Sequence, residues 1–195
     1  MTHTLEFPMI RRWIGGAKEW LSKFLASAPG LKSIVAIVVM GSAIRKRGHR
    51  RSDFDLLVVF RGKRPIIKAP LVIDIRFVSI DQIQDQISKG HEIVCWALQF
   101  GRVLYDPEHF WQKLANTWAG RVPLPSALDA QTRGEKCLAR AVEMINLEDE
   151  SAADDLVLGA LTQFGRQRLI EAGVFPASRP ELPCTGDCVG RSGHR

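Results

Sequence analysis

Three aspartates and a Gly-Ser pair stand where they could hold metal and phosphate together. Gly41 and Ser42 follow one apolar run, Asp53 and Asp55 open the next, and Asp74 interrupts a third. Magnesium prefers oxygen ligands such as carboxylates, and glycine lets backbone amides come close to a phosphate. These residue types predict a site that holds a nucleoside triphosphate through divalent metal.

The spacing of the aspartates decides whether their carboxylates can meet. Residues two apart in a strand point to the same face with Cα atoms roughly 6.5 Å apart, so Asp53 and Asp55 share a face. A neighbouring strand lies about 4.8 Å away, which brings Asp74 within reach if the two strands that carry these residues are adjacent. An arrangement of this kind suits two metal ions about 3.5–4 Å apart, as in two-metal phosphoryl transfer.

Hydrophobic periodicity predicts the elements that position these residues. Apolar spacing predicts helices over 9–27, 81–88, 90–100, 107–118, 126–148 and 151–172. Apolar or alternating runs predict strands over 34–40, 54–60, 71–79 and 103–105. Prolines 123 and 125 mark a boundary. We therefore expect a domain over 1–122 that carries the site, a helical segment over 123–174, and a disordered tail over 175–195.

Composition narrows the class of protein. Of the 195 residues, 46% are hydrophobic, which allows a folded core. The net charge of +6 suits an acidic partner such as a nucleotide, RNA or an acidic protein, but charge alone does not choose among them. The N-terminus lacks an apolar signal core, and the longest aliphatic run is too short to span a bilayer. We expect a cytoplasmic protein without a membrane segment.

The motif residues together resemble the polymerase-β-like nucleotidyltransferase superfamily. The pattern of that superfamily is Gly-Ser, around ten residues, Asp-x-Asp, and a third acid on a later strand. Gly41-Ser42, Asp53-Phe54-Asp55 and Asp74 match it in order and spacing. The small members called minimal nucleotidyltransferases are the most similar. The match covers about residues 31–80, with weaker similarity through 101–107.

The resemblance implies a fold and an activity. The fold is α+β, a small mixed β-sheet with flanking helices followed by a C-terminal helical segment. The activity is transfer of a nucleoside monophosphate from a triphosphate, with ATP expected, to an acceptor hydroxyl, with two Mg²⁺ ions as cofactors. Asp53 and Asp55 would hold the ions that bridge the triphosphate, Asp74 the ion near the acceptor, and Gly41 and Ser42 the β- and γ-phosphates.

The acceptor and partners stay open at this stage. A protein hydroxyl fits an antitoxin that adenylylates a HEPN-type toxin, a small molecule fits the aminoglycoside-modifying relatives, and RNA is suggested only by charge. The other class of function is a non-catalytic antitoxin or binding module, or a homo-oligomer, that uses the helical segment as its interface.

Individual residues have alternative readings too. Asp74 could instead form a surface ion pair with Arg76. The basic run over 45–51 could contact phosphate or be a solvated loop. Cys184 and Cys188 could suggest zinc, but the spacing favours an unstructured tail, and the unpatterned ending could also reflect truncation.

Overall fold

The computed structural model describes residues 16–26, 31–41, 44 and 53–176. These residues form two compact units that divide between Pro123 and Leu124. The first unit contains the sheet and its helices, and the second contains two long helices. Of the helix predicted over 9–27, residues 9–15 and 27 lie outside the described residues, and 17–26 are helical. The basic run over 45–51 and the tail from residue 177 also lie outside.

The first unit is built on a four-stranded mixed sheet with the order β3-β2-β1-β4. The strands are β1 (Ile34–Val39), β2 (Phe54–Phe60), β3 (Ile73–Ser79) and β4 (Arg102–Tyr105). β1 pairs antiparallel with both β2 and β4, whereas β2 and β3 are parallel. The expected α+β fold with a small mixed sheet is therefore confirmed.

The two central strands form the core of this sheet. Every residue of β1 is buried, as its β-branched and apolar composition predicts. In β2, Leu57 and Val59 are buried as fully as the residues on the opposite face. The alternation in β2 therefore does not separate a core face from a solvent face, because helices cover both sides of the sheet. Asp55 lies at the open end of this strand and is only half-buried.

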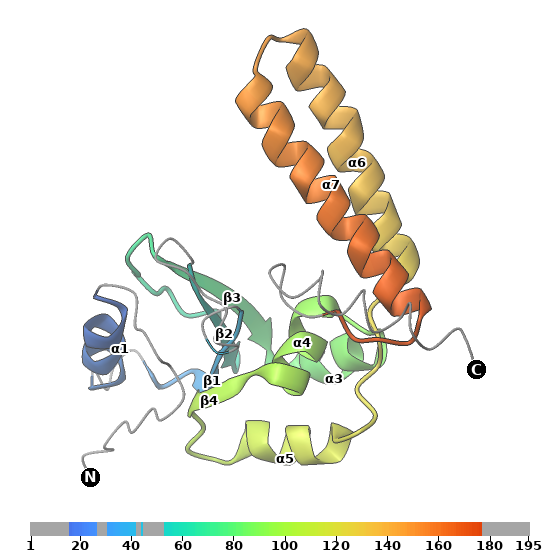
Figure 1. Cartoon of the computed structure of the whole chain (residues 1–195). Helices are drawn as coiled ribbons and strands as arrows, with labels where there is room; N and C mark the ends of the chain where they lie inside the picture. The colour runs from blue at the N-terminus through green and yellow to red at the C-terminus, as the bar shows by residue number, and fades with distance from the viewer. Residues whose placement is uncertain (1–15, 27–30, 42–43, 45–52, 177–195) are drawn as a thin grey trace. The chain divides into compact units, whose positions relative to one another are not determined.

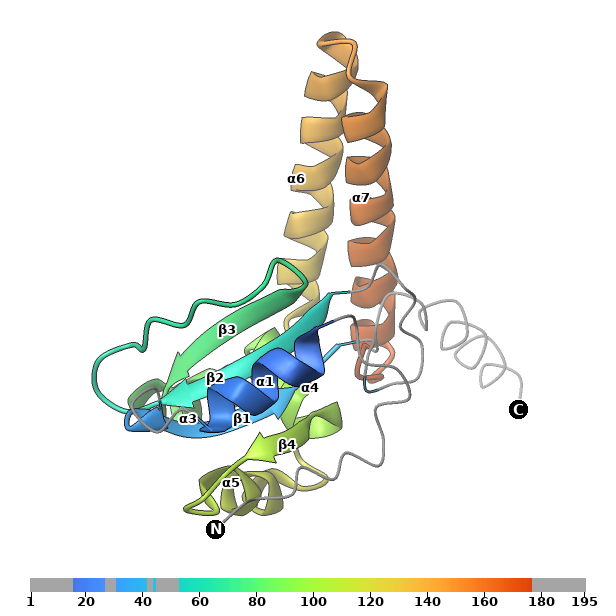
Figure 2. The ribbon, with the colours of Figure 1, turned by 90° about the vertical axis from the view of Figure 1, so that its left-hand side faces the viewer.

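Helices lie against both faces of the sheet, as Figures 1 and 2 show from two directions. α1 (Ala17–Ala26) is on one side, and α3 (Ile80–Ser88) and α4 (Glu92–Phe100) are on the other. α5 (Phe110–Trp118) follows β4. The Ser79 hydroxyl caps α3 by accepting a hydrogen bond from the Asp81 amide, so α3 begins where β3 ends.

One strand start differs from its prediction. The apolar run predicts a strand from residue 71, but β3 begins at Ile73. The Ile73 amide donates to the Pro70 carbonyl at 2.9 Å, which makes residues 70–73 a turn and leaves Leu71 fully exposed.

The second unit is an antiparallel helical hairpin of α6 (Ala127–Asn146) and α7 (Glu150–Glu171). The side chains of Ser126 and Asp149 cap the two helices by accepting backbone N–H bonds. The helices approach closely at Gly134, where a Cβ atom would lie 2.7 Å from the Phe164 ring. Within the described residues, no helix is both long enough and apolar enough to cross a membrane.

Candidate functional site

The sheet places Asp55 and Asp74 side by side. They are direct partners in the parallel ladder between β2 and β3, so both side chains project from the same face of the sheet. The Phe54 amide donates to the Val72 carbonyl at 2.8 Å and fixes this register just before the pair. Like charges placed opposite each other destabilise a sheet, so a pair of this kind needs a compensating role.

Asp55 has an unusual proton affinity. Burial first, and then the negative charges of Asp74 and Asp53, raise its pKa from an ordinary value of 3.8 to about 6. Arg76 opposes this shift. Asp53 itself is exposed and precedes β2. The three predicted aspartates therefore interact electrostatically, and this interaction contributes to the raised pKa of the half-buried Asp55.

Gly41 lies against one side of the aspartate group, next to Asp55. It follows β1, has φ +73°, and lies so close to Asp55 that an added Cβ atom would collide with carboxylate oxygen Oδ2. The Met40 amide donates to the Asp55 carbonyl at 2.9 Å and holds the end of β1 in this position. A side chain at residue 41 would fill the space beside the carboxylate, so glycine keeps that space open.

Asp74 also has a basic partner. Arg76 lies two residues further along β3 on the same face and donates from Nε and Nη2 to Asp74 Oδ2, at 3.1 and 2.7 Å. Both side chains are about half exposed, so the pair contributes little to stability. The ion pair that the sequence offered as an alternative for Asp74 is therefore present, and it coexists with the contact between strands.

Comparison with known proteins gives a family for the segment that carries this geometry. Residues 18–114 match the nucleotidyltransferase domain family. Those residues are therefore similar to nucleotidyltransferase domains. The matched segment contains Gly41, Asp53, Asp55 and Asp74, which the sequence motif singled out. No curated protein is significantly similar in sequence to the chain.

Solved structures resemble the chain only loosely. A nucleotidyltransferase-like protein from Exiguobacterium sibiricum is 14% identical with a TM-score of 0.39, and the likeness covers 82% of this chain and 59% of that one. A toxin-antitoxin structure with AMP-PNP is 15% identical with a TM-score of 0.32, covering 52% of this chain and 82% of that one. This chain thus spans 59% of the first structure's length. Scores this low carry no conclusion about activity or partners.

The carboxylates of the first unit suit a divalent cation by charge. The pKa of Asp55 is raised by burial and then by its negative neighbours, and a bound cation would offset both effects. Gly41 leaves room beside Oδ2. Across the part of the chain that the structure describes, however, no group of three or more His, Cys, Asp or Glu side chains is already gathered as a metal site. The donor set fits in type and charge, and Asp74 is bonded to Arg76.

Other predicted parts of the site fall outside the described residues. Ser42, the second half of the Gly-Ser pair, is one of them, as is the basic run over 45–51. Cys184 and Cys188 are outside as well. For these residues the sequence expectations stay predictions.

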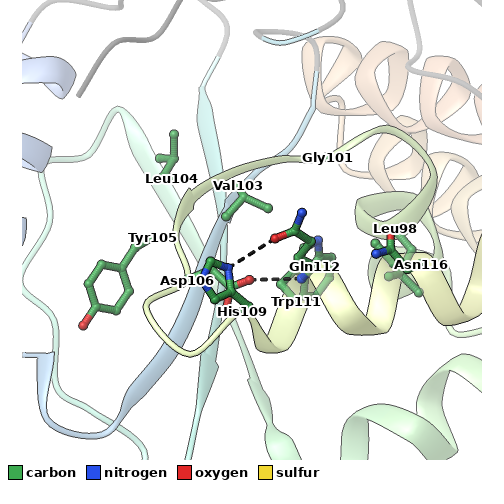
Figure 3. A pocket seen from close by; sticks show the side chains of 11 residues that line it. Leu98, Gly101, Val103, Leu104, Tyr105, Asp106, His109, Trp111, Gln112 and Asn116 are labelled. Carbon is green, nitrogen blue, oxygen red and sulfur yellow. Dashed lines mark hydrogen bonds between the residues drawn. The ribbon is translucent and has the colours of Figure 1, made fainter. Parts of the chain in front are cut away.

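The first unit also contains a cavity that the sequence motif did not indicate. It has a volume of about 430 Å³ and lies between the end of α4, β4 and α5 (Figure 3). Three polar residues lie at its wall, Asp106, His109 and Gln112. The backbone amide of Gln112 donates to Asp106 Oδ2 at 3.0 Å, and His109 Nδ1 lies 3.2 Å from the side-chain oxygen Oε1 of Gln112. The only sequence signal here was the Asp106-Pro107 pair after a strand, which reads equally well as a helix cap.

Proposed function

We propose that this chain transfers a nucleoside monophosphate from a nucleoside triphosphate to an acceptor hydroxyl. The observation that carries the proposal is the pairing of Asp55 with Asp74 on adjacent parallel strands, with Gly41 held against Asp55. The match of residues 18–114 to the nucleotidyltransferase domain family supports it. Scaffolds rarely set two carboxylates opposite each other unless a cation or proton is to be bound there.

In the proposed reaction, the acceptor oxygen forms a bond to the α-phosphorus as the bond to the pyrophosphate leaving group breaks. In the same step the acceptor hydroxyl passes its proton to the carboxylate of Asp74. Asp53 and Asp55 would hold the triphosphate through magnesium, which would neutralise charge on the phosphate oxygens. Asp74 would also hold the ion near the acceptor, and Gly41 and Ser42 would bind the β- and γ-phosphates. Catalysis comes from positioning and charge neutralisation rather than from a covalent intermediate.

Several finer points belong to the same proposal. We take ATP as the donor, two Mg²⁺ ions as cofactors, and the hydroxyl of a partner protein as the acceptor. A HEPN-type toxin as that partner follows from the resemblance to minimal nucleotidyltransferases. A cytoplasmic location is the expectation from the sequence. The alternative function is a binding module that has the same fold but catalyses no reaction.

The test is metal-dependent release of pyrophosphate. The protein is incubated with each labelled nucleoside triphosphate, alone and with a candidate partner protein, with and without magnesium. The double variant Asp53→Asn, Asp55→Asn should lose at least about 100-fold in rate, in line with the loss of a preorganised electrostatic group. A matched control is Asp81→Asn with Asp85→Asn, because both residues are exposed on α3 and outside the site.

Two outcomes would overturn the site assignment or the enzyme class. Equal release by the parent and the Asp53, Asp55 double variant contradicts the site. Release that does not depend on magnesium contradicts the metal-assisted reaction. A loss confined to the site variant, with the α3 control retaining activity within about twofold, supports both.

A further inference from the structure

The helical hairpin of the second unit exposes a group of large aliphatic side chains. Six of them have exposed fractions between 38% and 63%. They are Leu138, Val142 and Ile145 of α6 and Val157, Leu158 and Leu161 of α7. We name this set the apolar face of the hairpin. Single exposed aliphatic residues are ordinary, but a contiguous group of this size marks an interaction surface.

Both helices present these residues to the same side. Val142 follows the buried Ala141, and Leu161 follows the buried Ala160, so each is rotated about 100° from the contact line of its helix, in the same sense. In an antiparallel pair, side chains that are one residue past the contact line on each helix, counted along its own chain direction, lie on the same side of the pair. Spacings of three and four residues place the other members of the apolar face beside these two.

The hairpin cannot cover this face itself. The closest points between α6 and α7 are at glycines, with Gly134 against the Phe164 ring and Gly159 beside the Cys137 sulfur. Close approach at these glycines leaves little room between the helices for the aliphatic side chains of the apolar face. The large side chains therefore project outward, and two helices alone bury little apolar surface.

We propose that a second copy of this chain covers the apolar face, so that two hairpins form an antiparallel four-helix bundle about a two-fold axis. Six aliphatic side chains at roughly half exposure present on the order of 600 Å², which approaches the ~800 Å² per partner of a standard interface. The polar rim, which includes Glu135 and Asp154, supplies the rest. An aliphatic centre with a polar rim is the composition of a permanent homodimer rather than of a transient contact.

The charges along the hairpin favour a second copy in the antiparallel direction. The tip, residues 143–155, has six acidic residues and no lysine or arginine. They are Glu143, Glu148, Asp149, Glu150, Asp154 and Asp155. The base half, residues 127–142 and 156–171, is net basic, with five basic and three acidic residues. They are Arg133, Lys136, Arg140, Arg166 and Arg168, and Asp129, Glu135 and Glu171. Tip-to-tip alignment would bring like charges together, whereas the antiparallel alignment brings each acidic tip to the basic half of the other hairpin.

This inference does not depend on the proposed transferase function. It concerns the second unit alone, and its readout is a mass rather than a rate. It goes beyond the proposed function by giving the protein a two-fold assembly through α6 and α7.

The test is the mass of the full chain in solution without nucleotide, by sedimentation equilibrium and by light scattering on a sizing column. The parent should have twice the 21.8 kDa of one chain at micromolar concentration, and its melting temperature should rise with concentration. The double variant Val142→Glu, Leu161→Glu should be monomeric with its helical circular dichroism retained. The matched control Lys113→Glu adds the same negative charge on the exposed surface of α5, outside the hairpin, and should stay dimeric.

A milder variant tests the proposal if the two glutamate substitutions prevent the chain from folding. Leu158→Ala with Leu161→Ala shortens two side chains without adding charge and should raise the dissociation constant at least tenfold. A parent that is monomeric at about 100 µM would overturn the proposal, even if the chain then binds a different protein. So would a Val142, Leu161 glutamate variant that folds and stays dimeric, or an unchanged dissociation constant in the alanine variant.

Discussion

At the scale of single residues, the defining feature of the molecule is the raised pKa of the Asp55 carboxyl group. Asp55 gains this property from burial and from the parallel pairing that sets Asp74 beside it. The sequence predicted that Asp53 and Asp55 share a face, because that follows from strand alternation. It could not predict how deeply Asp55 is buried. Nor could it predict that Arg76 bonds to Asp74 and also lowers the pKa of Asp55, since both depend on the packed neighbours.

The raised pKa of Asp55 predicts how stability responds to pH. The folded protein binds this proton more tightly than the unfolded chain, so the stabilisation is complete below 3.8 and is lost as the pH rises through about 6. Asp55→Asn should therefore stabilise the metal-free protein above pH 6, by on the order of 1 kcal/mol after allowance for solvent screening, and have little effect below pH 4.

The measurement is urea unfolding of the parent and variant at several pH values in the presence of a chelator. Asp85→Asn is a suitable comparison, because that carboxylate is exposed and paired with Lys89 on the surface. A stability difference between the parent and Asp55→Asn that stays constant from pH 4 to pH 8 would contradict the account.

Gly41 and Gly62 form a natural pair for testing the space beside Asp55. Both have positive φ, +73° and +71°, so alanine should cost each about 1–2 kcal/mol of backbone strain. Only at Gly41 would the new Cβ atom meet a carboxylate, whereas nothing lies within 4 Å at Gly62. Gly41→Ala should therefore destabilise the protein more than Gly62→Ala in chemical unfolding.

A double-mutant cycle separates the two contributions at Gly41. In an Asp55→Ala background the collision partner is gone, so the excess cost of Gly41→Ala over Gly62→Ala should shrink or disappear. Equal losses at the two glycines in the parent background would mean that residue 41 does not pack against the carboxylate.

At the scale of elements, the sequence predicted the strands well and their exposure less well. The run over 54–60 became β2 with the same bounds, and the adjacency of β2 and β3 that the site required is present. β-branched apolar runs indicate buried strands because few other structures accept them. The exposed Leu71 and the two-sided burial of β2 were not predictable, because a turn and the helices on both faces decide them.

The hairpin glycines offer a test at this scale. Alanine for glycine inside a helix ordinarily stabilises by up to about 1 kcal/mol. Gly159→Ala should do so, because its Cβ atom would lie at an ordinary 3.6 Å from the Cys137 sulfur. Gly134→Ala should instead destabilise by about 1–3 kcal/mol, since its Cβ atom would press on the Phe164 ring.

Thermal and urea unfolding at one fixed protein concentration measure both glycine variants. The sign of the difference is what matters: stabilisation by both substitutions would show that α6 and α7 do not pack as closely at Gly134 as the structure has them.

At the scale of the whole molecule, two units with different chemistry share one chain. The first unit contains the carboxylate pair, and the hairpin contains an acidic tip and an apolar face. The sequence indicated a boundary near Pro123 and a helical segment after it. Apolar spacing predicted the helix over 151–172 but not which of its apolar residues are buried, because hydrophobic periodicity does not distinguish an internal contact from a contact with another chain.

The central claim is that Asp55 and its neighbours bind a nucleoside triphosphate through divalent metal. Calorimetric titration of ATP into the full chain tests it most directly, with magnesium and then with a chelator, on the parent and on Asp55→Asn. We predict binding that requires magnesium and weakens at least about 20-fold in Asp55→Asn, while Asp85→Asn binds as the parent does. Equal affinity in the parent and Asp55→Asn, or binding that is unchanged without magnesium, would contradict the claim.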